Sequence, residues 1–162
     1  MNNNIMKIEY ITGSILDSKE KYIVNQTNCI TKKALGLSDS IFKKFPYADI
    51  YTSRAEDNHV DKPGKIIVCG DGRSNRYIIN LLGQYYPGKP KHKNDTYEMR
   101  KKWFIDCLDE IIKINKLDSI AFPYKIGCGL AGGDWKEYLD MLTTFSNKTI
   151  AKVYIYQRPE DL

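Results

Sequence analysis

One short segment limits the fold more than any other: a glycine-rich stretch between a predicted strand, residues 119–122, and a predicted helix, residues 135–145. Glycine permits positive φ and lets backbone N–H groups approach a ligand without a Cβ in the way. At the start of a helix those N–H groups meet the positive end of the helix dipole, which favours an anion such as phosphate. The stretch is therefore a phosphate-binding loop in outline. Its glycines are Gly127, Gly129, Gly132 and Gly133.

The rest of the chain alternates strand-like and helix-like segments, which predicts an α/β fold with a mixed sheet covered on both faces. We expect strands at 5–12, 22–24, 65–69, 76–82, 119–122 and 150–156, and helices at 38–44, 48–57, 96–115 and 135–145. Residues 70–75 form a hairpin-like turn between two of the strands. The length of 162 residues suits one domain, residues 1–162. In such sheets ligands bind beyond the strand ends, where the loops gather.

Composition excludes several classes of protein. The longest apolar runs, such as 77–83, are too short to span a bilayer, and the first residues show no secretory pattern. The four cysteines form no CxxC pair and only two histidines, His59 and His92, are present, which argues against zinc sites and a disulfide framework. We expect a cytoplasmic protein with reduced cysteines, no metal and no cofactor, and both histidines at the surface.

The net charge of +5 is spread along the chain, apart from one local cluster of Lys89, Lys91, His92 and Lys93. This loop is either a solvated surface loop or a site that attracts phosphates or nucleic acid. Because the chain has neither a basic stripe nor an aromatic RNA-binding motif, we do not predict a nucleic-acid-binding protein.

A second polar loop, residues 25–39, follows the second predicted strand. Asn25 and Asn28 carry both donors and acceptors, which suits ribose hydroxyls but equally suits the capping of a turn. Gly36 lies in a weaker glycine turn, where Ser38 is expected to be the N-cap of the next helix.

Asp134 directly precedes the last predicted helix, with Glu137 three residues later, so the two form a capping box. A carboxylate beside a phosphate loop also suits a general base that orients water, and the two roles are compatible. Cys128 has no visible basic partner and is expected to be a packing residue. Tyr154 and Tyr156 share one face of the last strand, as a wall for a nucleobase or as ordinary sheet packing.

Together these residues resemble the macrodomain family, which binds ADP-ribose. The resemblance rests on residues 10–16, 23–28 (IVNQTN), 79–84, 126–135 (IGCGLAGGDW) and 152–156. It implies a three-layer α/β/α fold with a central mixed sheet and a cleft for ADP-ribose. The chain is most similar to the compact branch that includes ADP-ribose 1''-phosphate phosphatases and terminal ADP-ribose glycohydrolase.

Asp134 is the carboxylate in the glycine-rich loop, and we hypothesise that Asp134 and Asn28 are catalytic, with Asp134 positioning or deprotonating water and Asn28 orienting the ribose. The resemblance also implies roles for individual residues. The remaining expected binding residues fall into three groups along the ligand. Ser14, Ile15 and Tyr156 would lie near adenine; Gly36, Leu37, Ser38, Gly127, Cys128, Gly129, Leu130, Ala131, Gly132 and Gly133 would wrap the diphosphate; Asn25 and Gln84 would join Asn28 near the distal ribose.

Several residues depart from the family pattern. Many macrodomains have an aspartate where Ser14 stands, and several consecutive glycines where this chain has Gly36 alone. Glycohydrolase-like members use a lysine and an aspartate, but Ala131 occupies the aspartate position and residues 84–89 give no clean match to the lysine. The covalent route of those members is therefore not expected here.

The predicted function is hydrolysis of an ADP-ribose derivative at the distal ribose, with ADP-ribose 1''-phosphate, which releases phosphate, as the expected substrate. The alternatives are a non-catalytic reader of free or protein-linked ADP-ribose and a hydrolase that removes ADP-ribose from macromolecules. A third alternative is RNA binding through residues 89–93. ADP-ribosylated macromolecules are the expected partners, and the chain is expected to be a monomer.

Overall fold

The computed structural model describes residues 8–161 and contains a six-stranded mixed sheet with the order β1-β6-β5-β2-β4-β3. Five strands run parallel, and β3 pairs antiparallel with β4. The predicted mixed sheet and the hairpin between its third and fourth strands are confirmed. The strands are β1 (Ile8–Thr12), β2 (Tyr22–Thr27), β3 (Ile66–Cys69), β4 (Tyr77–Leu82), β5 (Ser119–Pro123) and β6 (Lys152–Gln157).

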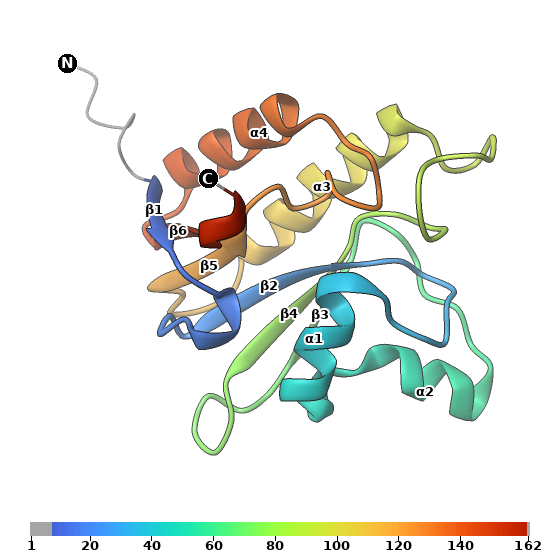
Figure 1. The fold of residues 1–162 in the computed structure, drawn as a ribbon, viewed down its shortest axis with the longest axis horizontal. Coiled ribbons are helices and arrows are strands. Elements are labelled where there is room, and N and C mark those ends of the chain that lie inside the picture. The colour runs from blue at the N-terminus through green and yellow to red at the C-terminus, as the bar shows by residue number, and fades with distance from the viewer. Residues whose placement is uncertain (1–7, 162) are drawn as a thin grey trace.

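Helices cover both faces of the sheet, so the three-layer α/β/α architecture is confirmed: α3 and α4 lie on one face and α1 and α2 on the other (Figure 1). The α-helices are α1 (Gly36–Lys44), α2 (Ile50–Asp57), α3 (Tyr97–Ile112) and α4 (Trp135–Lys148). Short 3-10 turns are η1 (Ile15–Asp17), η2 (Pro46–Ala48) and η3 (Pro159–Asp161). No helix in residues 8–161 is both long and apolar enough to cross a membrane.

Each face of the sheet has its own apolar core. Phe104, Leu108 and Ile111 recur on one side of α3 and are buried against β2 and β4, as their three- and four-residue spacing requires. On the other face Ile41 and Phe42 of α1 pack with residues of α2. These two cores fix the helices against the sheet and thereby hold the loops between them.

Some predicted boundaries differ from the structure. The second strand continues to Thr27, beyond the predicted end at 24, because the side chains of Asn25, Gln26 and Thr27 all find hydrogen-bond partners. The first helix begins at Gly36 and the last one runs to Lys148. Predicted strand residues 5–7 lie outside the described residues.

The strand directions determine where a site can form. All five parallel strands point the same way, so the loops after β1, β2, β4, β5 and β6 gather at one edge of the sheet. Both polar loops singled out in the sequence leave this edge, one after β2 and one after β5.

Candidate functional site

A cleft of about 970 Å³ runs across the C-terminal ends of the parallel strands. It brings together thirteen of the seventeen residues expected at the site: Ser14, Ile15, Asn25, Asn28, Gly36, Leu37, Ser38, Gln84, Gly127, Gly129, Leu130, Ala131 and Tyr156. Cys128, Gly132, Gly133 and Asp134 are not among the lining residues. Segments more than a hundred residues apart in the sequence therefore meet in one hollow.

The loop after β5 folds tightly over the ring of Tyr138. Gly127 has φ +78°, and a Cβ there would lie 2.6 Å from that ring, so only glycine fits. The Gly133 N–H donates to the Gly127 carbonyl at 3.0 Å, which closes the loop on itself. The N–H groups of Gly127, Gly129, Leu130 and Ala131 have no acceptor among residues 8–161, and all four residues line the cleft. The loop thus presents a row of free donors to a ligand.

The start of α1 presents a second set of free donors. Its N-cap, Leu35, has no side chain that can accept from the first turn. The N–H groups of Gly36, Leu37 and Ser38 have no acceptor in the described part of the chain, and all three residues line the cleft. The expectation that Ser38 caps this helix is wrong: the helix begins two residues earlier, and the Ser38 hydroxyl donates to Asn25 Oδ1 at 3.0 Å. An anion in the cleft would satisfy this uncapped terminus.

Asn25 is buried, and its side chain is committed to the protein. Besides accepting from Ser38, it donates from Nδ2 to Asn80 Oδ1 at 3.2 Å, while Asn80 donates to the Ala48 carbonyl at 3.0 Å. This network ties β2 to β4 and to the start of α1. Asn25 therefore holds the first glycine turn in place from beneath.

Asn28 has one half of its amide engaged and the other half free. Its Oδ1 accepts from the Ile30 N–H at 3.0 Å and from the Thr31 N–H and hydroxyl at 2.9 and 3.0 Å, so Asn28 does cap a turn. Its side-chain hydrogen bonds within residues 8–161 all involve Oδ1 and none involves Nδ2, and the residue lines the cleft. The turn thus aligns a free amide donor for a ligand.

The backbone of Asn28 is held by residues that the sequence interpretation missed. Its carbonyl accepts from the buried Arg54 at 2.6 Å, and its N–H donates to the Tyr51 hydroxyl at 3.0 Å. Arg54 also pairs with Asp61 at 2.9 Å and lies over the Tyr51 ring. His59 Nε2 lies 3.6 Å from Asp61, so one of the two histidines belongs to this outer cluster.

Gln84 has both ends of its amide engaged. Its Nε2 donates to the Tyr86 carbonyl at 2.9 Å, and its Oε1 accepts from Gln26 Nε2 at 2.8 Å. Since a carbonyl can only accept, Tyr86 fixes the orientation of both amides. Gln26 Oε1 is left buried and without a partner among the described residues, beside Gly83 and Gly127.

A second buried arginine holds the glycine-rich loop. Arg100 forms a two-pronged ion pair with Asp95, at 2.6 and 2.8 Å, and also donates to the carbonyls of Gly88 and Ala131. It thereby joins the loop after β4 to the loop after β5. The sequence carried a signal for it, because Arg100 lies one turn before Phe104 on the apolar face of α3, where a charged residue is unexpected.

Asp134 and Cys128 have structural surroundings. Asp134 is the N-cap of α4 and accepts from the Lys136 N–H at 3.0 Å, which turns its carboxylate toward the helix and not the cleft. Glu137, the expected partner in the capping box, instead pairs with Lys101 at 2.6 Å. Burial raises the pKa of the Cys128 thiol to about 12, which opposes thiolate chemistry and agrees with a packing role.

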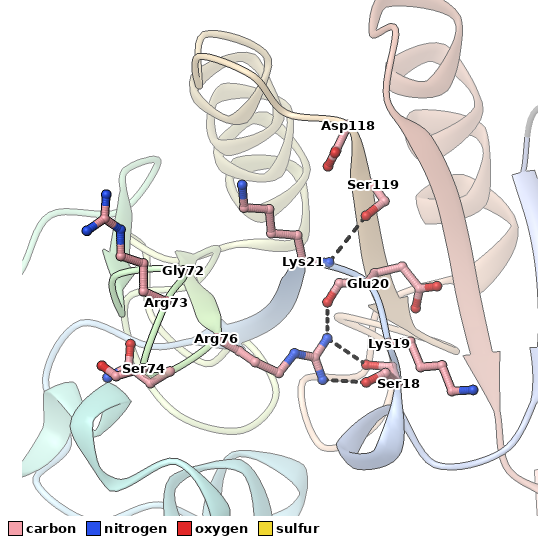
Figure 2. Close-up of a pocket in the computed structure, with 11 residues that line it drawn as sticks. Ser18, Lys19, Glu20, Lys21, Gly72, Arg73, Ser74, Arg76, Asp118 and Ser119 are labelled. Atoms are coloured by element: carbon pink, nitrogen blue, oxygen red, sulfur yellow. Dashed lines mark hydrogen bonds between the residues drawn. The ribbon is translucent and has the colours of Figure 1, made fainter.

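The β1–β6 end of the cleft has an aromatic wall. Tyr154 and Tyr156 share the α1–α2 face of β6, as the strand period predicts. The Tyr156 hydroxyl donates to the Glu20 carboxylate at 2.6 Å. Figure 2 shows the Glu20 carbonyl and Ser18 bound in turn by Arg76. Burial, with a smaller contribution from Glu20, raises the pKa of Tyr156 to about 12, so the ring is a neutral wall. Ser14 caps η1 by accepting from the Leu16 N–H.

The hollow drawn in Figure 2 lies at the opposite edge of the sheet, at the N-terminal ends of β2, β4 and β5, and has a volume of about 670 Å³. The predicted basic loop lies elsewhere: Lys89 packs over Gly132 of the glycine-rich loop, and the His92 ring lies against the Tyr86 ring at an interplanar angle of 34°. Within residues 8–161 no group of three or more His, Cys, Asp or Glu side chains is placed to hold a metal ion.

Known structures share this fold. The macrodomain of Mycobacterium tuberculosis DarG has 21% sequence identity and a TM-score of 0.74, with 92% of this chain and 96% of that chain covered. A Bacteroides thetaiotaomicron protein has 24% identity and a TM-score of 0.72, with 92% and 98% covered. A variant of the Oceanobacillus iheyensis macrodomain, solved with ADPR, has 19% identity and a TM-score of 0.68, with 99% and 91% covered.

A search of curated proteins gave no match. The family model described as Macro domain, in contrast, matches residues 24–142, from β2 into α4. This range contains both glycine turns, Asn28 and the two buried arginines that hold the loops. The cleft, the fold and this match, which spans well over half of the sequence, lead to one assignment: the chain belongs to the Macro domain family.

Proposed function

We propose that the cleft binds ADP-ribose along the C-terminal edge of the sheet. The adenine would lie at the β1–β6 end, the diphosphate between the two glycine turns, and the distal ribose beside Asn28. The observation that carries this proposal is that two sets of free N–H groups line one cleft: those of Gly127, Gly129, Leu130 and Ala131, and those of residues 36–38. Such donors neutralise a diphosphate without a large positive charge.

Three kinds of chemistry follow one another along the cleft, and their order supports this orientation. Ile15 and Tyr156 give an apolar, aromatic end that suits a purine ring. The N–H rows occupy the middle, and the free amide of Asn28 lies past them, directly after the end of β2. Macrodomains bind ADP-ribose, which contains these same three parts in this order.

We further propose hydrolysis at the distal ribose, with ADP-ribose 1''-phosphate as the substrate. The free N–H groups and Asn28 Nδ2 would stabilise charge that develops on the departing phosphate. The Asp134 carboxylate is engaged in capping α4 and lies outside the lining. The surroundings of the two residues therefore support Asn28 more strongly than Asp134 as the residue on which turnover depends.

One observation favours a second candidate, a reader that binds ADP-ribose without cleaving it. Among the described lining residues the one carboxylate is Asp161, and it lies at the β6 end, away from Asn28. The described lining therefore offers no carboxylate base to a water at the distal ribose. Removal of ADP-ribose from macromolecules would need such a water as well, so the same test separates both hydrolases from the reader.

Calorimetric titration with ADP-ribose, with ADP and AMP as controls, tests the binding site. We expect saturable binding that weakens when the distal ribose is absent. Leu37→Glu should abolish binding, because its charge would face the diphosphate, yet an acidic residue in the first turn of α1 favours the helix. Val60→Glu adds the same charge at an exposed loop and is the matched control. Absence of heat with every ligand would overturn the proposal.

Phosphate release from ADP-ribose 1''-phosphate, at enzyme excess and long incubation, then separates the hydrolase from the reader. Release that Asn28→Ala abolishes supports hydrolysis. Binding without release of phosphate or ADP-ribose assigns the chain as a reader.

A further inference from the structure

The hollow at the N-terminal ends of β2, β4 and β5 carries more positive than negative charge. Its charged lining residues are the cations Lys19, Lys21, Arg73 and Arg76 and the carboxylates Glu20 and Asp118. The ion pairs within residues 8–161 include none of the four cations. The lining therefore offsets the positive charge of this hollow only in part.

Arg76 differs from the two other arginines that hold loops. Arg54 and Arg100 are buried, and each pairs with a carboxylate. Arg76 is half-buried, and its hydrogen bonds go from Nη1 and Nη2 to the carbonyls of Ser18 and Glu20 and to the Ser18 hydroxyl, with none from Nε. Burial outweighs the nearby charge of Glu20 and lowers the pKa of Arg76. A cation removed from water in this way gains from an anion beside it.

The ring of Tyr77 organises the rim of the hollow. Lys21 Nζ lies 5.9 Å from the centre of this ring. The turn that carries Arg73 packs on the same ring, because Gly72 has φ +72° and a Cβ there would overlap it. Figure 2 shows the side chains of Lys21 and Arg73 extending toward the same side of the view, whereas Lys19 extends away from them. Two cations are thus presented together above the guanidinium of Arg76.

These donors suit a phosphate group better than a carboxylate. A phosphate monoester carries about two negative charges at neutral pH and several strong acceptor oxygens, so it can use more than one of the donors. Guanidinium groups also match the geometry of phosphate oxygens. The volume of about 670 Å³ lies within the range of roughly 300–1,000 Å³ that small-ligand sites occupy, which leaves room for a molecule that carries the phosphate.

We propose that this hollow is a second binding site, which holds a phosphate-bearing molecule through Lys21, Arg73 and Arg76. The recognised group is the phosphate, and its source is either free phosphate or a phosphate ester of a larger molecule. Because the hollow and the cleft lie at opposite edges of the sheet, the proposal is independent of ADP-ribose binding.

An NMR titration of the ¹⁵N-labelled full chain at constant ionic strength locates binding by residue. The probes are inorganic phosphate and ribose 5-phosphate, with acetate as the control anion. We expect saturable shifts of the backbone amides of residues 18–21, 72–76 and 118–119 with both phosphates. Tighter binding of ribose 5-phosphate at these residues assigns the site to an ester, and equal affinities assign it to the phosphate group alone. Equal shifts with acetate would identify a solvated basic surface and overturn the proposal.

The variants Lys21→Ala and Arg73→Ala should each weaken phosphate binding about threefold, and their combination about tenfold, as expected for exposed charges. Lys148→Ala removes an exposed lysine of α4 outside the hollow and should leave the affinity unchanged. Thermal melts verify that the variants are folded. An unchanged affinity in the double variant, or shifts confined to residues 36–38 and 127–131, overturns the proposal and leaves the cleft assignment intact.

Discussion

The substitution Asn28→Asp removes the free Nδ2 donor from the cleft and keeps the hydrogen bonds of the turn around it. The Ile30 and Thr31 N–H groups and the Thr31 hydroxyl bind Oδ1, and an aspartate oxygen accepts these three bonds equally well. The change therefore replaces only the Nδ2 donor, and puts a charged acceptor where the distal part of the ligand is proposed to lie. We expect the melting temperature to stay close to that of the wild type.

The size of the effect should depend on the ligand. A ribose hydroxyl can turn and donate to the new carboxylate, so ADP-ribose binding should weaken only a few-fold. A phosphate cannot donate in this way: at about 4 Å and an effective dielectric constant near 20, two unit charges repel by about 4 kcal/mol. This corresponds to roughly a thousandfold loss for ADP-ribose 1''-phosphate at low salt, and to less as salt screens the charges.

Calorimetry with both ligands at two salt concentrations measures this difference. Asn147→Asp makes the same change at an exposed position of α4, near its C-terminal end, and should leave both affinities unchanged. Equal affinities of Asn28→Asp for the two ligands would refute the placement of the distal ribose beside Asn28.

Three further predictions concern the stability of the fold. Asp134→Ala removes the N-cap of α4 and should cost about 1 kcal/mol of stability, which corresponds to a fall of roughly 2–4 °C in melting temperature. Asp134→Asn should keep the cap. Equal melting temperatures of the two variants would contradict the capping role. Arg100→Met leaves the buried Asp95 without its cation and should lower the free energy of unfolding in urea by about 3–5 kcal/mol. Lys102→Met removes an exposed cation of α3 and should lower it only slightly. Similar losses of stability in the two variants would show that the buried pair does not hold the loops. Hydrogen bonds from the Arg73 N–H, then from the Ser74 hydroxyl and the Asn75 N–H, lower the pKa of Asp71. The contribution of this carboxylate to stability is therefore present above about pH 4 and is lost as the pH falls through the lowered pKa. Asp71→Asn should flatten the acid dependence of the urea midpoint between about pH 5 and 3, and an unchanged slope would contradict this role of Asp71.

The fold was predictable because apolar periodicity and glycine positions are local signals. The helix over 97–112 and the hairpin between β3 and β4 follow from side-chain spacing and turn composition alone. The extent of β2 was not, because Asn25 and Gln26 favour a turn until distant partners, Asn80 and Gln84, pair with them. Strand order was likewise beyond the sequence pattern, since it depends on contacts between distant segments.

The loops of the site could be predicted from the sequence, but the residues that hold these loops in place could not. The glycines and Asn28 stand out in the sequence, but Arg54 and Arg100 act on carbonyl groups 26 and 31 residues away. Ser38 and Asp134 show the opposite difficulty. Both fit the pattern of a helix cap, and only the three-dimensional start of each helix shows that Asp134 caps its helix while Ser38 binds Asn25.

The position of β6 has a consequence for how the protein is made. In the described sheet β6 lies between β1 and β5, so β1 is joined to the other strands through the last of the six described strands to be synthesised. The pairs β2–β4 and β3–β4 need only residues up to 82 and can form early in synthesis. A chain truncated before Lys152 would leave β1 and one edge of β5 unpaired, and unpaired strand edges promote aggregation. Shortened translation products should therefore be removed by proteolysis or aggregate, and should not persist as partial binding domains.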